Sequence, residues 1–217
     1  MIAMDRRVSE AVRYLGYGKN AVDDRTRNLI ALSFQELEQV AAVKSVYQFF
    51  SCIVEKEEEV RIGTMEVRSR NLAKNMKGCQ EAAMFGITLG TGADLLIRKY
   101  MVTDMAKAVV TQACAAVLLE EACDDLQEKI KKEKAKEDLW IRPRFSPGYG
   151  DFDIHHQKDI LRILDTHKKI GLSMTDSYML TPTKSVTALI GICKEEMQCH
   201  KTGCESCTQL DCQYRRN

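Results

Sequence analysis

Residues 144–192 read RFSPGYGDFDIHHQKDILRILDTHKKIGLSMTDSYMLTPTKSVTALIGI, and this stretch contains the pattern that decides the class of fold. A proline followed by a glycine predicts a tight loop over 142–150. Isoleucines and leucines at helical spacing then predict an amphipathic helix over 154–170. Two short strands are expected over 177–180 and 185–193, because β-branched and aromatic residues gather there. The stretch therefore combines a loop, a helix and strands in one unit.

The upstream sequence adds long helices and further strands in no strict alternation, which indicates an α+β fold with a mixed or antiparallel sheet and long flanking helices. The expected helices are 6–18, a second one capped by Asp23 or Asp24, and 94–134 with a break near 102–104; the expected strands are 46–54, 60–67 and 82–89, and 72–76 is a loop or short helix. The highly charged segment 127–138 is expected to be the solvated end of the long helix.

Composition excludes several classes of protein. Of the 217 residues, 45% are hydrophobic and 29% are charged, the balance of an ordinary globular chain. The formal net charge of +1 argues against a general nucleic-acid binder. The longest apolar run, Ala113 to Leu119, is too short to cross a membrane. The first residues, MIAMDRR, resemble no secretory signal, so we expect a cytoplasmic protein.

The loop carries the first candidate site. Pro147 and Gly148 would hold backbone N–H and C=O groups at a fixed angle, and such groups match the edge of an adenine. Arg144 offers a planar fork for a carboxylate or a phosphate, and Tyr149 offers a flat face. The alternative is a simple helix-entry turn with a surface arginine.

Glu120 is a second candidate, because it falls on the same helical face as Ala113, Ala116 and Val117. A carboxylate beside a buried stripe needs a partner, either an internal Arg or Lys or a cationic ligand group. The glycine turn 90–94 lacks the full fingerprint of a nucleotide-binding loop and is expected to join a strand to a helix. The sequence contains no nucleophile–base pattern, so catalysis by side chains alone is not indicated.

The cysteines at the end of the chain form a third candidate. Cys199, Cys204, Cys207 and Cys212 lie close together, and Cys193 precedes them. Thiolates at these spacings could hold an iron–sulfur cluster or zinc, or they could remain reduced thiols. We expect the four to bind one metal centre, with iron–sulfur favoured and Cys193 as a spare or substitute ligand.

Two motifs in order resemble the activation domain of vitamin B12-dependent methionine synthase. The first is the R-x-x-P-G-Y loop, Arg144–Tyr149, and the second is TDSYMLTPTKSV, Thr175–Val186. The segments AVRYLGYGKNAVDD and FGITLGTGAD also resemble short stand-alone members of this family. The resemblance covers about residues 8–192, which suggests an activation-like domain over 1–192 and a cysteine-rich tail over 193–217.

The resemblance implies a C-shaped α+β fold that binds S-adenosylmethionine. Arg144 would hold the methionine carboxylate, the Ser146–Pro147–Gly148 backbone and the Tyr149 ring would meet the adenosine, and Glu120 would lie near the methionine end. The chain would act as the activation component of a methyltransferase and dock on a partner chain that carries cobalamin. That partner would be a methionine synthase or a related corrinoid protein, and the protein would support its reductive remethylation.

A flavodoxin-like protein or another donor would supply the electron for this reaction. The alternative function is an iron–sulfur electron-transfer protein that reduces a corrinoid partner without S-adenosylmethionine. A zinc-stapled interaction module is the third interpretation.

Overall fold

The computed structural model describes residues 2–17, 22–56 and 58–195. Their contacts divide them into two compact units. We call residues 2–17, 22–42 and 89–121 the helical unit, and residues 43–56, 58–88 and 122–195 the sheet unit. The long helix α5 (Met105–Ala135) contributes its first part to one unit and its second part to the other.

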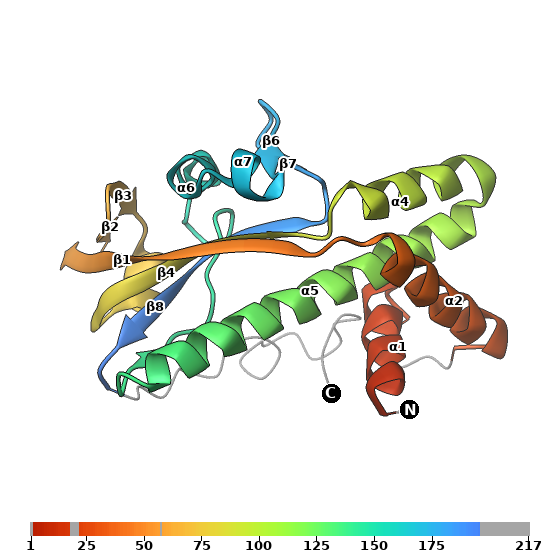
Figure 1. The fold of residues 1–217 in the computed structure, drawn as a ribbon, viewed down its shortest axis with the longest axis horizontal. Helices are drawn as coiled ribbons and strands as arrows, with labels where there is room; N and C mark the ends of the chain where they lie inside the picture. The colour runs from red at the N-terminus through yellow and green to blue at the C-terminus, as the bar shows by residue number, and fades with distance from the viewer. Residues whose placement is uncertain (1, 18–21, 57, 196–217) are drawn as a thin grey trace. The chain divides into compact units, whose positions relative to one another are not determined.

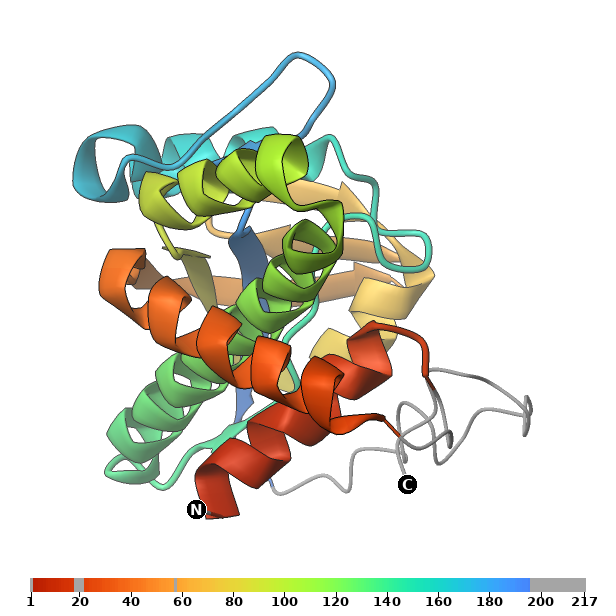
Figure 2. The same ribbon diagram turned by 90° about the vertical axis from the view of Figure 1, so that its right-hand side faces the viewer.

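The helical unit contains α1 (Ile2–Tyr14), α2 (Asp24–Val40), α4 (Thr91–Thr103) and the first part of α5 (Figure 2). Of the two predicted candidates, Asp23 caps α2, since its carboxylate accepts a hydrogen bond from the backbone N–H of Thr26 at 2.7 Å. The apolar side of α2, including Ile30, Phe34 and Leu37, is buried. This burial supplies the unit with its core.

The predicted glycine turn and helix break are both confirmed. Gly90 has φ +80° and stands directly before α4, so the turn does join a strand to a helix. Asp104 separates α4 from α5 in an extended conformation. Its carboxylate accepts the backbone N–H of Lys107 at 3.0 Å, which caps the start of α5.

The sheet unit is built on a sheet of strand order β3–β2–β1–β4–β8–β5, and each of these neighbours pairs antiparallel (Figure 1). The strands are β1 (Lys44–Lys56), β2 (Glu59–Ile62), β3 (Met65–Arg68), β4 (Cys79–Thr88), β5 (Trp140–Ile141) and β8 (Ser185–Cys193). The α+β class with an antiparallel sheet is therefore confirmed.

Helices cover both faces of this sheet. The helices α3 (Arg70–Met76), α6 (His156–Leu164) and α7 (Thr166–Ile170) lie on one face. Together with the strands they enclose a hydrophobic core whose buried residues include Met76, Met84, Phe152, Ile160, Leu164 and Leu189. The second part of α5 lies on the other face, next to Tyr47 and Phe49 of β1. The unit is thus a sheet between two helical layers.

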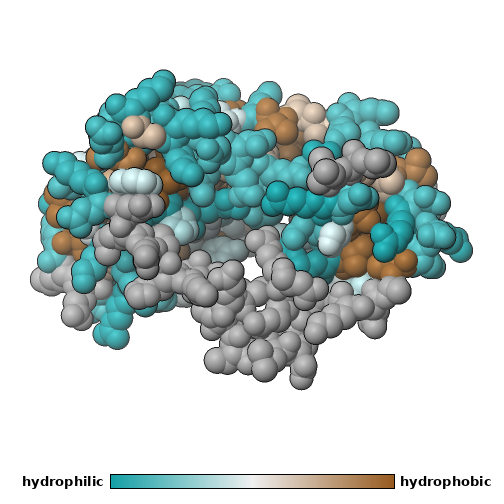
Figure 3. All heavy atoms as spheres, turned by 90° about the horizontal axis from the view of Figure 1, so that it is seen from below, coloured by the Kyte–Doolittle hydropathy of each residue, from teal (hydrophilic) through white to brown (hydrophobic). Residues whose placement is uncertain are grey.

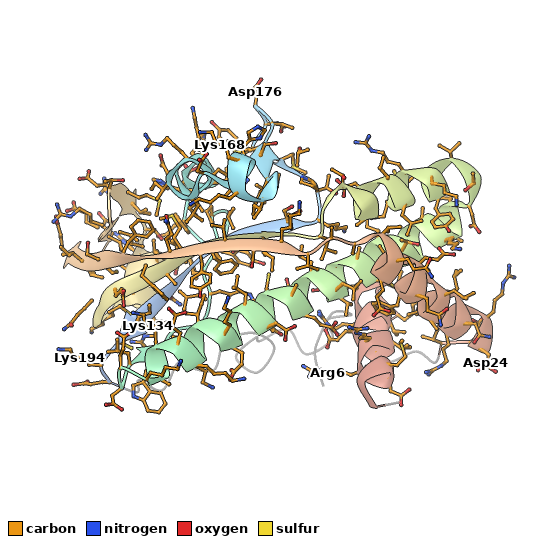
Figure 4. The ribbon with its side chains drawn as sticks, in the orientation of Figure 1. Arg6, Asp24, Lys134, Lys168, Asp176 and Lys194 are labelled. Carbon is orange, nitrogen blue, oxygen red and sulfur yellow. The ribbon has the colours of Figure 1, made fainter. Side chains whose placement is uncertain are left out.

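Three sequence expectations need correction. Residues 60–67 form a hairpin rather than one strand, because Gly63 adopts φ +57° and turns the chain between β2 and β3. The helix expected over 154–170 is interrupted at Asp165, which has φ +52°. The strand expected over 177–180 is shorter: β7 (Leu180–Thr181) pairs with β6 (Ser173–Met174). The intervening turn carries Asp176 at its tip (Figure 4).

The expectation that the charged segment 127–138 is a purely solvated helix end is also wrong. Ile130 is fully buried and Lys134 is 5% exposed. The Lys134 ammonium lies 2.7 Å from the Glu81 carboxylate and 4.2 Å from the centre of the Phe49 ring (Figure 4). A lysine can be buried here because its ammonium meets both a carboxylate and an aromatic ring on the sheet.

One face of the described residues is mainly polar. On the face seen in Figure 3, hydrophilic side chains cover most of the described surface, and hydrophobic ones form small groups among them. Within the described part of the chain, no helix has both the length and the apolarity that a membrane span requires.

Candidate ligand-binding site

The candidate loop between β5 and α6 is anchored to the sheet at its start. Phe145 and Leu189 of β8 exchange two backbone hydrogen bonds, of 2.8 and 2.9 Å. The Phe145 ring stacks on Phe152 at 6.2 Å, and Pro147 between them is buried. Backbone and aromatic contacts therefore hold both ends of the R-x-x-P-G-Y motif in place.

The turn itself is closed by its own backbone. The N–H of Gly148 donates to the carbonyl of Phe152 at 2.7 Å, and the N–H of Tyr149 donates to the carbonyl of Ser146 at 3.2 Å. Gly148 has φ +91°, a conformation that a side chain would strain. Tyr149 is 67% exposed. The anchored turn thus presents an aromatic ring to solvent.

Asp151 ties this turn to α3. Its carboxylate accepts hydrogen bonds from the Ser69 hydroxyl at 2.5 Å and from the backbone N–H groups of Arg70 at 2.8 Å and Asn71 at 3.1 Å. The hydrogen bond from Ser69 contributes most, and together these bonds hold the pKa of Asp151 below its ordinary value. One carboxylate therefore satisfies the start of a helix and fixes the end of the loop.

Arg144 lies at the start of the loop and already has an acidic partner. Its Nη1 donates to Asp124 Oδ1 at 2.6 Å and to Gln127 Oε1 at 3.4 Å, both on the second part of α5. The Arg144 side chain is 23% exposed, and that of Asp124 is 60% exposed. The guanidinium expected to bind a carboxylate is thus placed where it holds one.

The sequence reasoning did not single out Asp124 or Gln127. The available signal was helical spacing, because Asp124 follows Glu120 by four residues and shares its helix face. Nothing in the sequence indicated which segment would meet Arg144, since the contact joins residues 20 apart through the tertiary fold.

Glu120 is partly buried in the first part of α5, and Ala113 and Val117 of its predicted face are buried. Glu120 belongs to the helical unit, whereas Arg144, Ser146 and Tyr149 belong to the sheet unit. The structure therefore groups the loop residues in one element, and the ligand-binding role of Glu120 stays a prediction.

Most of the cysteines predicted as metal ligands lie outside the described residues. Cys199, Cys204, Cys207 and Cys212 all lie there, so their metal site stays a prediction. Cys193 ends β8, is 3% exposed, and stands opposite Cys79 of β4. Burial raises the pKa of Cys79, and the thiol of Cys193 raises it further. Among the residues that can be described, no cluster of three or more His, Cys, Asp or Glu side chains could hold a metal ion.

An antiparallel sheet between helical layers, with an anchored loop that carries an arginine and a tyrosine, places this protein in the α+β class. The sequence profile of the family "Vitamin B12 dependent methionine synthase, activation domain" matches residues 71–216. This is more than half of the chain, and the chain belongs to that family. The match includes the loop and extends over the cysteine-rich tail.

The fold is similar to that of a solved relative, the MetH reactivation domain in a crystal structure bound to AdoHcy. The TM-score is 0.60 and the sequence identity is 14%, over 89% of this chain and 78% of the other. At this identity the likeness establishes the fold alone.

Proposed function

We propose that this member of the activation-domain family helps to activate a B12-dependent methionine synthase by binding S-adenosylmethionine at the loop 144–149. It would do so while docked on a partner chain that carries cobalamin. The observation that carries this proposal is the anchored loop, in which a carboxylate-binding arginine and an exposed tyrosine flank a closed turn. The AdoHcy bound to the MetH reactivation domain supports the same ligand class.

The residues of the loop fit this ligand. The Arg144 guanidinium holds an aspartate carboxylate at 2.6 Å, which supports the proposal that it would bind the carboxylate of a methionine. The backbone of Ser146, Pro147 and Gly148 would meet the adenine edge, and the exposed Tyr149 ring would lie against its face. S-adenosylmethionine would supply the methyl group to reduced cobalamin, and the protein supplies binding and orientation.

Two further parts of the proposal come from residues outside this loop. Glu120 would contribute a negative charge near the methionine end of the ligand. The tail cysteines 199, 204, 207 and 212 would hold an iron–sulfur or zinc centre, and a flavodoxin-like protein or another donor would provide the electron. The family match over the tail supports treating these residues as part of the same protein module.

Calorimetry with S-adenosylmethionine tests the proposal, with and without a cobalamin-binding methyltransferase. Arg144→Ala is expected to weaken binding by about 1.5–3 kcal/mol, the scale of a charge-assisted hydrogen bond. Arg144→Lys should recover little, because a lysine has no planar fork. Arg162→Ala, on the exposed side of α6 where its side chain is 72% exposed, serves as the matched control.

Equal affinity of the Arg144→Ala variant and the parent protein would show that Arg144 does not hold the ligand. Failure of the parent to bind S-adenosylmethionine in either condition would contradict the proposed function as a whole.

A further inference from the structure

The partner of Arg144 is itself a charged group that a ligand can reach. Asp124 Oδ1 lies 2.6 Å from Nη1 of Arg144, and its side chain is 60% exposed. Gln127, one turn further along α5, places its Oε1 at 3.4 Å from the same nitrogen. The Arg144 guanidinium therefore contacts a carboxylate and a neutral amide oxygen on the second part of α5.

This pairing makes the site poorly suited to a simple carboxylate. An incoming carboxylate that approached Arg144 would also approach the Asp124 carboxylate, and the two like charges would repel each other. A lone arginine would have no such discrimination. The arrangement instead presents one positive and one negative charge within hydrogen-bond distance of each other.

An α-amino acid end carries the complementary pair of charges. Its carboxylate and its ammonium are attached to the same carbon, so they are close enough to meet adjacent partners of opposite sign. The carboxylate would take the guanidinium of Arg144, and the ammonium would donate to Asp124. Both contacts would form at an exposed position, without opening the core.

We infer that Asp124 is a specificity-determining residue which, paired with Arg144, selects ligands with a free α-ammonium group. This inference rests on the proposed function, because it requires that the ligand carboxylate binds at Arg144. Gln127 would help to hold the guanidinium in place when Asp124 turns toward the ammonium. Exposed ion pairs contribute little on their own, so the rearrangement of the Arg144–Asp124 contact has a low cost.

Two probes separate the two charges. The first is AdoHcy, which has the complete amino-acid end, and the second is the analogue in which hydrogen replaces its α-amino group. Affinities are measured by calorimetry for the parent protein, Asp124→Asn and Asp125→Asn. Asp125 is the matched control because it is the next residue of α5, is also exposed, and undergoes the same change of charge.

The Asp124→Asn variant is expected to bind AdoHcy about tenfold more weakly, since the charge-assisted bond to the ammonium is lost. It should bind the deaminated analogue about two- to fivefold more tightly, since the repelling carboxylate is gone. The inference therefore predicts that the substitution changes the two affinities in opposite directions. Asp125→Asn should leave both affinities within about twofold of the parent values.

Asp124→Asn binding AdoHcy as tightly as the parent, or more tightly, would overturn the inference and leave the proposed function standing. It would mean that Asp124 only competes with the ligand for Arg144 or takes no part. A parent protein that binds neither probe, with or without the cobalamin-binding partner, would overturn the proposed function and the inference together.

Discussion

Gly92 shows how one backbone position sets the packing of two helices. It lies in the first turn of α4, where an added Cβ would stand 2.1 Å from the carbonyl oxygen of Val40 at the end of α2. Gly171 presents the opposite case. It has φ +70°, and among the described residues no atom would come within 4 Å of an added Cβ. A side chain at position 92 would therefore clash with a neighbouring helix, whereas one at position 171 would meet only backbone strain.

We predict that Gly92→Ala lowers the free energy of unfolding by about 3 kcal/mol, because the helices must move apart to admit a methyl group. Gly171→Ala should cost only about 1–2 kcal/mol, the cost of a left-handed conformation with a side chain. Urea denaturation followed by circular dichroism measures both. Equal losses in the two variants would show that α2 and α4 can separate at little cost.

At the scale of single elements, the second part of α5 is attached to the sheet by charged side chains as well as by apolar ones. Lys134 contacts Glu81 and the Phe49 ring, and the Tyr47 hydroxyl donates to the Glu133 carboxylate at 2.8 Å. Lys134 is 5% exposed, and its ammonium is compensated by Glu81 at 2.7 Å and by Glu137 at 3.4 Å. These contacts position the same helix that carries Asp124.

Replacing Lys134 with methionine should therefore destabilise the protein by about 1–3 kcal/mol, since a buried ion pair loses one partner and Glu81 loses its counter-ion. Lys132→Met is the control on the same helix, because its side chain is 75% exposed and should change stability by no more than about 0.5 kcal/mol. Chemical denaturation of both variants checks this. If the two substitutions have equal effects, the contact between Lys134 and the sheet has no energetic role.

The junction between the candidate loop and α3 predicts a dependence on pH. The hydrogen bonds from Ser69, Arg70 and Asn71 lower the pKa of Asp151 in the folded protein. A lowered pKa means that the unfolded chain takes up a proton first as the pH falls. The stability from Asp151 is therefore complete above the unfolded pKa of about 4, and it is lost as the pH falls through the lower folded value.

The Asp151→Asn variant should be less stable than the parent at neutral pH. It should also lose less stability than the parent between about pH 5 and pH 3, a window of about one unit on either side of the unfolded pKa. Thermal unfolding of both proteins at a series of pH values measures the difference. Asp176→Asn is the control, because Asp176 is exposed in the turn between β6 and β7. Parallel pH profiles for parent and Asp151→Asn would contradict the assignment.

At the scale of the whole molecule, the family profile covers both the described loop and the cysteine-rich end of the chain. We predict that protein purified without oxygen contains one metal centre held by Cys199, Cys204, Cys207 and Cys212, because four unmetallated thiolates so close together would repel each other. Iron with acid-labile sulfide would indicate a cluster, and zinc alone would indicate a structural site.

Cys199→Ser should then lower the bound metal and leave the thermal unfolding of the sheet unit unchanged. Cys114→Ala is the control, because Cys114 is fully buried in the helical unit and takes no part in the proposed centre. Parent protein without iron or zinc would exclude the centre, and with it the alternative function of iron–sulfur electron transfer.

The sequence alone determined the α+β class, most helices and long strands, a helix cap at Asp23 or Asp24, the turn at Gly90 and the loop that carries Arg144. These features depend on local patterns, namely hydrophobic period, capping residues and glycine conformation, which act within a few residues of the chain. The two motifs of the resemblance are also local sequence patterns, and they indicated the family correctly.

The tertiary structure alone decided what each charged group meets. Asp124 faces Arg144, Lys134 is buried against β1 and β4, and Asp151 caps a helix that begins 81 residues earlier. The structure also placed the hairpin turn at Gly63 and the helix break at Asp165, where the backbone takes positive φ angles. Such partners are far apart along the chain, and a charged residue has the same local signature whether it is solvated or paired, so only the folded chain distinguishes the two.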